Sequence, residues 1–314
     1  MTTGSSSEPL GADVSPSLPL MGRLAIVGLG LIGSSVGLAC RARGLAKEIR
    51  GADIATDHRA HAIALGVVDL TFADAGAAVE GADMVLLAVP VGAIAPTLER
   101  IVPHLAPGAV VTDVGSVKRV VTAAMDRLLP KGNGVPGHPI AGRETSGPYA
   151  ASAELFVSAK CVLTPSVITD PAAASRVGAL WNGMGAEVLQ MSPERHDEIF
   201  AAVSHLPHIV AYALMGAIFD LEDGENLQAL AGGGLRDFSR VAMSHPIMWR
   251  DICLANREPI LKMIERFQAA LGDLAATISA EDGEGLRQRF ARARACREDF
   301  RSGNEGNDRE RPGR

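Results

Sequence analysis

The sequence predicts an α/β fold, in which a doubly wound parallel sheet is followed by an all-α domain. Short apolar runs alternate with helical patterns from residue 22 to about residue 191. Past residue 191 the strand-like runs disappear, and long helical patterns continue to about residue 300. A glycine-rich turn of the form G-x-G-x-x-G joins the first apolar run to the first helix. Together these observations indicate a Rossmann-type sheet, with its ligand at the carboxyl ends of the strands.

The composition is that of a two-domain globular protein. The 314 residues are 47% hydrophobic and 21% charged, which allows a large buried core. We expect a disordered segment over 1–21, a Rossmann domain over 22–191, a helical domain over 192–300 and a disordered tail over 301–314. The formal net charge of −6 argues against nucleic acid and anionic membranes as partners.

The four cysteines predict neither a disulfide framework nor a metal site. Cys40, Cys161, Cys253 and Cys296 lack C-x-x-C spacing and lie mostly in apolar surroundings. Thiols of this kind are typical of the reducing cytoplasm, where we expect the protein to be located.

The glycine-rich turn has the context of a dinucleotide-binding site. Gly28 permits the tight turn after the strand at 24–27, Gly30 lets the backbone approach a pyrophosphate, and Gly33 allows close helix–strand packing. The helix that follows presents free N–H groups to the phosphates. Asp53 lies twenty positions past Gly33, where such folds place the acid that binds a ribose hydroxyl. The alternative is an ordinary glycine-rich turn with an unrelated aspartate.

Further strands and helices follow in order. Strands are expected at 49–53, 84–90, 110–114, 161–164 and 187–190. Thr56 or Asp57 is a candidate cap for a short second helix, and Ser116 is a candidate N-cap for the helix after the strand at 110–114. A glycine- and proline-rich loop leads into residues 137–142.

A long uncharged helix is predicted at the start of the helical domain. Residues 199–219 carry no formal charge and have the length of a membrane span. The segment contains Ser204, His205, Pro207 and His208, which are costly in lipid. We therefore expect a buried helix at a subunit interface and a homodimer, with no membrane partner.

Two groups of reactive side chains fall within the helical domain. His196, Ser204 and His208 are spaced to share one face of a single helix, although isolated polar residues of this kind often only cap or satisfy a core. The glycine run 232–234 precedes Arg236 and Arg240, which suits an anion site. The alternative for this second group is a helix-start loop with surface ion pairs.

Several segments of the chain resemble the prephenate/arogenate (cyclohexadienyl) dehydrogenase family. The resemblance runs in order over about residues 22–300. Its segments at 137–142 and 204–208 are far more specific than the glycine motif. These segments are 27–34 (VGLGLIGS), 113–118 (DVGSVK), 137–142 (GHPIAG), 204–208 (SHLPH), 236–240 (RDFSR) and 246–249 (PIMW). One departure is Arg143-Glu144, where the family often has Thr-Glu.

The resemblance implies oxidative decarboxylation of prephenate to 4-hydroxyphenylpyruvate, or of arogenate to tyrosine, with NAD as hydride acceptor. It implies that neutral His138 accepts the proton of the C4 hydroxyl and that Ser116 orients His138 and the nicotinamide. Arg240 would bind the ring carboxylate, and His208 with Ser204 the side-chain carboxylate. His196, Glu144, Asp237 and Trp249 would support or gate the site. The implied cofactor contacts are Gly28, Gly30, Leu31, Ile32, Gly33, Asp53, Val89 and Ser116.

Substrate preference is the least determined feature, and two other classes of protein remain as alternatives. Arg143 would favour the dianion prephenate over arogenate, unless it points to solvent or pairs with Glu144 or Asp237. A β-hydroxyacid dehydrogenase usually brings a catalytic lysine from its helical part, where this chain has only Lys262. A non-enzymatic NAD sensor would not need His138, Ser116 and Arg240 together.

Overall fold

The N-terminal half is the expected Rossmann-type domain. The computed structural model describes residues 19–130, 132–143, 147–221 and 230–308. Its six-stranded sheet is parallel throughout, in the order β3-β2-β1-β4-β5-β6. The strands are β1 (Met21–Val27), β2 (Ala46–Ala52), β3 (Leu70–Phe72), β4 (Met84–Leu87), β5 (Val110–Asp113) and β6 (Gly134–Val135).

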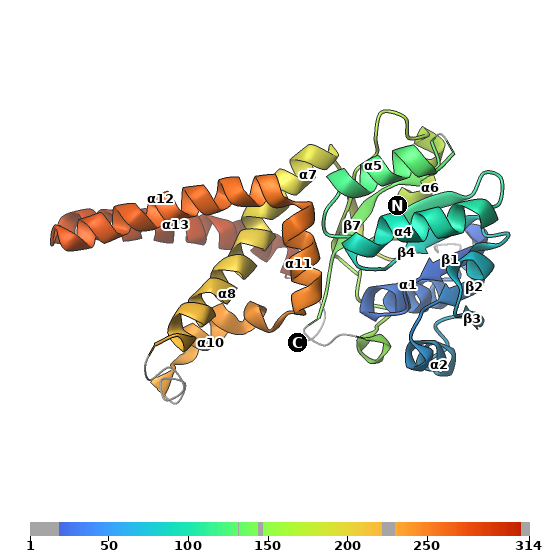
Figure 1. The fold of residues 1–314 in the computed structure, drawn as a ribbon, viewed down its shortest axis with the longest axis horizontal. Coiled ribbons are helices and arrows are strands. Elements are labelled where there is room, and N and C mark those ends of the chain that lie inside the picture. Colours follow the sequence, from blue (N-terminus) through green and yellow to red (C-terminus); the bar gives the residue numbers. More distant parts are fainter. Residues whose placement is uncertain (1–18, 131, 144–146, 222–229, 309–314) are drawn as a thin grey trace, which may run out of the picture.

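Helices cover both faces of this sheet (Figure 1). One apolar cluster joins the sheet to α1 (Leu31–Ala42), α2 (Thr56–Ala64) and α6 (Pro171–Gly183). A second cluster joins its other face to α3 (Ala75–Val79), α4 (Val91–Ile101) and α5 (Arg119–Leu128). The apolar runs that predicted strands are therefore buried on both sides, as parallel sheets require.

A second sheet of three strands follows the first, where the sequence suggested one continuous parallel sheet. It has the order β7 (Gly137–Ile140), β8 (Lys160–Leu163) and β9 (Glu187–Gln190). The β7–β8 pair is antiparallel and the β8–β9 pair is parallel. The difference lies in the connections. The described part of the β7–β8 connection contains only the short η2 (Pro148–Ala150), whereas α6 supplies the crossover that a parallel β8–β9 pair needs.

The C-terminal half is helical. It begins with α7 (Pro193–Phe200), which continues through the π-helical segment η3 (Ala201–His205) into α8 (Leu206–Phe219). The helices that follow are α10 (Gly233–Ser239), η5 (Arg240–Met243), α11 (Pro246–Ala255), α12 (Arg257–Ser279) and α13 (Gly283–Asp308). In Figure 1, α12 and α13 lie side by side and project away from the Rossmann half as a long arm.

The continuous helix Pro193–Phe219 is apolar and long enough to span a bilayer, although 22% of its most apolar window is buried within the chain. Such a helix is weak evidence for a membrane span, because interface and core helices have the same composition. The first turns of this helix are fixed to the Rossmann half, where the side chains of His196 and Asp197 are fully buried.

Three helix ends differ from the sequence predictions. Helix α2 is capped by Ala55 without a side-chain bond, and neither Thr56 nor Asp57 takes that place. Helix α5 begins at Arg119 with Lys118 as its N-cap, so Ser116 lies outside the helix. Helix α13 continues to Asp308, past the predicted limit at 300, because extending a formed helix costs far less than starting one.

A small apolar cluster joins the two halves. Val117 of the Rossmann half packs with Trp249 and Ile252 of α11, and Val91 and Tyr212 pack against them. Helix α11 lies against α4 through these contacts. The carboxyl end of β5 is thereby held close to the helical half.

Candidate active site

The glycine-rich turn has one position that the protein's own packing does not explain. Gly28 has φ +100°, and a side chain there would overlap the carbonyl of Ala88. A Cβ on Gly33 would overlap the carbonyl of Gly28, which accounts for the third glycine. A Cβ on Gly30 would meet nothing within 4 Å. The missing side chain at Gly30 therefore makes room for a group from outside the chain.

The chemistry of this turn fits a dinucleotide. Helix α1 begins at Leu31 without a side-chain cap at Gly30, so the N–H groups of Leu31 and Ile32 and the positive helix end are available to a pyrophosphate. Val89 follows β4 and flanks Gly28. The predicted cofactor contacts Gly28, Gly30, Leu31, Ile32, Gly33 and Val89 therefore lie together around this turn.

Asp53 lies at the carboxyl end of β2, as predicted for a ribose ligand. The N–H of Leu29 donates to its Oδ2 at 2.8 Å, and the N–H of Ala55 donates to its Oδ1 at 2.9 Å. His58 Nδ1 lies 3.3 Å from Oδ2, and Arg59 donates to the Asp53 carbonyl at 2.7 Å. These bonds fix the carboxylate beside the glycine turn, where a ribose hydroxyl can donate to it.

A buried ion pair fixes the backbone at the start of β7. The Lys118 ammonium donates to Asp113 Oδ2 at 2.5 Å and to the Gly137 carbonyl at 2.7 Å. Asp113 Oδ1 accepts the Gly137 N–H at 3.0 Å. Both side chains of the pair are fully buried. Each backbone polar group of Gly137 is thereby bound, and the next residue, His138, is positioned at the carboxyl end of β5.

His138 belongs to a row of three side chains. Its Nδ1 lies 2.8 Å from Nε2 of His196, and Nδ1 of His196 lies 2.8 Å from Oδ1 of Asp197. The Phe200 ring stacks on His196 at 4.4 Å between centroids and contacts His138 at 4.7 Å. His196 and Asp197 are fully buried, whereas 9% of His138 remains accessible. The row thus leads from the interior to one accessible imidazole.

The surroundings keep these histidines neutral. Burial, together with the positive charges that His196 and Lys118 can carry, holds the pKa of His138 well below its ordinary value of 6.5. Burial also lowers the pKa of His196, although the hydrogen bond to Asp197 opposes this effect. A neutral imidazole is the form that can accept a proton from a substrate hydroxyl.

Asp197 was not identified from the sequence, although it follows His196 directly. Its Oδ1 accepts the N–H of Lys118 at 2.8 Å and its Oδ2 accepts that of Arg119 at 2.9 Å. It therefore caps α5 from another element, the role that the sequence had suggested for Ser116. The contact spans 79 residues along the chain, so local spacing does not reveal it.

The predicted substrate contacts lie around α8. His208 stacks on Trp249 with ring centroids 3.9 Å apart, and its Nδ1 donates to the Ser204 carbonyl at 2.9 Å. Burial lowers the pKa of His208, and the charge of Arg240 lowers it further. Arg240, at the start of η5, thus belongs to the surroundings of His208, and η5 packs against α8.

The expected common face of His196, Ser204 and His208 is altered by the π-helical segment. Its wider turns change the register between α7 and α8, so that His196 contacts His138 while His208 contacts Trp249. His205, which the sequence analysis did not name as a site residue, is buried. Its Nδ1 lies 3.0 Å from the Asn256 amide, and burial lowers its pKa to about 4.

The remaining predicted site residues form no hydrogen bond to His138 among those that the structure describes. The Nδ1 of His138 is bound by His196 rather than by Ser116, which follows β5 as a half-buried residue. Arg143 is exposed and donates to the Ala150 carbonyl at 3.1 Å. Asp237 is exposed on α10. Glu144 lies outside the described residues.

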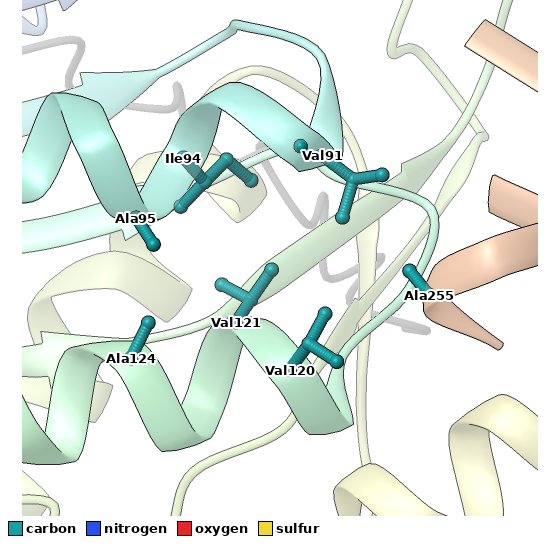
Figure 2. A pocket seen from close by; sticks show the side chains of 8 residues that line it. Val91, Ile94, Ala95, Val120, Val121, Ala124 and Ala255 are labelled. Carbon is teal, nitrogen blue, oxygen red and sulfur yellow. The ribbon is translucent and has the colours of Figure 1, made fainter. Parts of the chain in front are cut away.

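An apolar pocket of about 260 Å³ lies elsewhere, at the junction of the halves. Figure 2 shows side chains of α4 and α5 pointing toward one another across it, with Ala255 of α11 at one end. Its lining is Val91, Gly92, Ile94, Ala95, Val120, Val121, Ala124 and Ala255. None of these is a predicted site residue, so the pocket is distinct from the candidate active site.

Comparison with known proteins agrees with this geometry. Residues 36–190 match the family model of the prephenate dehydrogenase nucleotide-binding domain, and residues 192–292 match that of the prephenate dehydrogenase dimerization domain. A cyclohexadienyl dehydrogenase from Zymomonas mobilis is 36% identical over 276 residues, covering 87% of this chain and 94% of the relative. A prephenate dehydrogenase from Bacillus subtilis is 36% identical over 286 residues, covering 89% of this chain and 75% of the relative.

A solved structure extends the agreement to three dimensions. Prephenate dehydrogenase from Aquifex aeolicus, in complex with hydroxyphenyl propionate and NAD+, is 36% identical with a TM-score of 0.85. The match covers 90% of this chain and 99% of that one. Both domain models and these relatives show that the chain belongs to the prephenate dehydrogenase family.

Proposed function

We propose that the protein catalyses the NAD-dependent oxidative decarboxylation of prephenate to 4-hydroxyphenylpyruvate, a step of tyrosine biosynthesis. The observation that supports this most directly is the buried, neutral His138, which is bound through one ring nitrogen and accessible over 9% of its surface. It lies at the carboxyl edge of the sheet whose glycine-rich turn fits a dinucleotide. Family membership makes this function favoured over a β-hydroxyacid dehydrogenase or an NAD sensor.

In the proposed reaction, His138 is the general base. Bound NAD supplies the acceptor for the hydride that leaves ring C4. His138 takes the C4 hydroxyl proton as carbonyl character develops at that carbon, and the O–H electron pair remains on oxygen. When CO₂ leaves C1, the electrons of the broken bond make the ring aromatic and the proton returns to the phenol oxygen. Neutral His138 is ready to accept that proton because its pKa is low.

The substrate carboxylates are assigned to the helical half. The guanidinium of Arg240 suits the ring carboxylate, because it can bind both oxygens at once. His208, held by Trp249 and the Ser204 carbonyl, is assigned to the side-chain carboxylate. Ser116 is assigned to the nicotinamide, since it follows the carboxyl end of β5.

The working form is proposed to be a cytoplasmic homodimer built on the helical half. Large apolar side chains are exposed along α8 and the arm, among them Phe219, Leu271 and Ile278. A second copy of this surface would cover them symmetrically. The cytoplasmic location is proposed because cysteines without C-x-x-C spacing are typical of a reducing compartment.

The decisive experiment is NADH formation with prephenate and arogenate side by side, on the same enzyme preparation. We expect turnover with prephenate and a lower catalytic efficiency with arogenate. A higher efficiency with arogenate would identify an arogenate dehydrogenase, and similar efficiencies would identify a cyclohexadienyl dehydrogenase. Absence of turnover with both would contradict the proposed function.

A further inference from the structure

The row His138–His196–Asp197 contains a charged group that the proposed reaction does not yet use. Asp197 is fully buried, and His196 lies between it and the base His138. Its carboxylate forms no hydrogen bond to a residue assigned to the substrate or the cofactor. A buried carboxylate is costly unless it is fully bonded. The question is what this carboxylate does for His138.

The hydrogen bonds assign the protons in the row. A carboxylate only accepts, so Nδ1 of His196 carries its proton and donates to Asp197. Neutral His196 then has its lone pair on Nε2, which accepts a hydrogen bond from the Nδ1–H of His138. The remaining nitrogen of neutral His138, Nε2, therefore holds the free lone pair. Burial lowers the pKa of both imidazoles, which keeps them in these neutral forms.

We propose that Asp197 is a positioning residue for the proton transfer, acting on His138 through His196. It fixes both tautomers so that the lone pair of His138 lies on Nε2. Its negative charge also stabilises the positive charge that the imidazole pair acquires when His138 holds the substrate proton. The proposal rests on His138 being the base of the proposed function.

The carboxylate of Asp197 is held by bonds on both of its oxygens. Besides His196, Asp197 accepts the first N–H groups of α5, from Lys118 and Arg119, where the helix end is positive. These bonds fix the direction in which the carboxylate faces His196. The order of the three side chains is that of the Ser-His-Asp arrangement of hydrolases, in which the acid orients the imidazole and stabilises its positive charge.

A purely structural role is the competing explanation, because Asp197 also caps α5. Asp197→Asn removes the charge and keeps one cap oxygen, but its amide nitrogen cannot accept the second N–H of α5. The two roles are therefore separated by combining this variant with the double-mutant cycle described next. We expect kcat to fall by about 10²- to 10⁴-fold: the range is the contribution of a positioned general base, and its upper end is the loss seen when the acid of a Ser-His-Asp row is neutralised. The KM for prephenate and the Kd for NAD should change by less than about threefold. A kcat within threefold of the wild type would overturn the proposal.

A double-mutant cycle tests whether Asp197 acts through His196. In His196→Gln the amide oxygen can still accept a hydrogen bond from Nδ1 of His138. Glutamine has no imidazole tautomer for Asp197 to select, however, and cannot share the positive charge of His138. In that background Asp197→Asn should cost less than about threefold in kcat, whereas a structural role would cost the same in both backgrounds. The control is Ser192→Ala, which removes the N-cap of the same helix α7, a 3.2 Å bond to the Arg195 N–H, and should leave kcat unchanged.

The tautomer itself can be measured without substrate. In ¹⁵N spectra of the substrate-free wild type, His138 should show a protonated Nδ1 and an unprotonated Nε2. A protonated Nε2 would overturn the proposal even if Asp197→Asn fails to fold. Lack of turnover by the wild type would instead refute the proposed function and would leave this assignment standing.

Discussion

The two halves of the chain differ in how completely they bury their own apolar side chains. In the Rossmann half, two clusters enclose the faces of the sheet, and even Trp181 and Phe156 are fully buried. Along α8 and the arm, by contrast, Phe219, Leu271 and Ile278 each expose more than half of their surface. Large apolar patches on a soluble protein mark interaction sites. The Rossmann half buries its own apolar core, whereas the helical half leaves an apolar surface that a partner could cover.

The same division runs through the candidate active site. His138 is bonded to His196, and its neighbour Gly137 is bonded to Asp113 and Lys118; these buried contacts need no second chain. His208 and Arg240 lie on the helical half, which exposes more of its apolar side chains. We therefore expect the acid–base chemistry to be independent of assembly and substrate binding to depend on it.

The largest expected effect is at His138. His138→Asn should lower kcat by about 10²- to 10⁴-fold, the usual contribution of a positioned general base. Because the dinucleotide site belongs to other strands, the Kd for NAD should stay nearly unchanged, as measured by fluorescence titration. A loss of activity below threefold would remove His138 from the mechanism.

The assembly prediction contrasts exposed apolar residues of the two halves. Leu271→Glu on the arm should shift the dimer toward monomer, because burying a leucine contributes about 1.5–3 kcal/mol and the change occurs twice in a symmetric interface. This corresponds to at least about a hundredfold weaker dimerisation, measured by sedimentation velocity. Val167→Glu in the Rossmann half, where Val167 is fully exposed, is the matched control and should have no effect. A wild type that is monomeric at micromolar concentration would contradict the prediction.

Cofactor choice tests the Rossmann half alone. The fixed carboxylate of Asp53 accepts from a 2′-hydroxyl and repels a 2′-phosphate, so the catalytic efficiency with NAD should exceed that with NADP by at least about tenfold. Asp53→Ser should narrow this ratio, whereas Asp57→Asn, an exposed acid on the next helix, should leave it unchanged. Higher efficiency with NADP would show that Asp53 is misassigned.

The pH dependence reports the environment of His138. Only the neutral imidazole accepts a proton, and burial, with His196, Lys118 and His205 nearby, lowers its pKa. Activity is therefore present above the folded pKa and lost as the pH falls through it. We expect log(kcat/KM) to stay level from pH 8 through pH 6.5, with its acidic limb below 6.5. A limb centred at or above pH 6.5 would show that His138 is solvated.

Sequence reasoning succeeded where a local pattern carries the physics. The three glycines, the apolar run of β1 and the acid after β2 have fixed spacings, because one βα unit imposes them. Asp197 and the π-helical segment were not predicted. Asp197 acts on residues 78 and 79 positions away, and the π-helical segment packs against α12, more than fifty residues further along the chain. For the same reason the sequence suggested Ser116 as the cap of α5, whereas the structure has Asp197, which is distant in sequence, in that role.

The smallest expected effect concerns Arg143, which tests whether a residue of the Rossmann half influences substrate choice. Prephenate has a keto group where arogenate has an ammonium, so a cation near that position favours prephenate. Arg143 follows β7 five residues after His138, but it is exposed and donates one N–H to the Ala150 carbonyl. Solvent screens an exposed charge, and we therefore expect Arg143→Thr to move the ratio of catalytic efficiencies toward arogenate by only about two- to fivefold.

Arg41→Thr is the matched control for this change, because Arg41 is an exposed arginine of the same domain, paired with Asp69 at 2.7 Å. It should leave the prephenate-to-arogenate ratio unchanged. If Arg143→Thr leaves the ratio unchanged as well, Arg143 does not distinguish the two side chains. The discrimination then belongs to His208 and Arg240, and the helical half alone would set the choice of substrate.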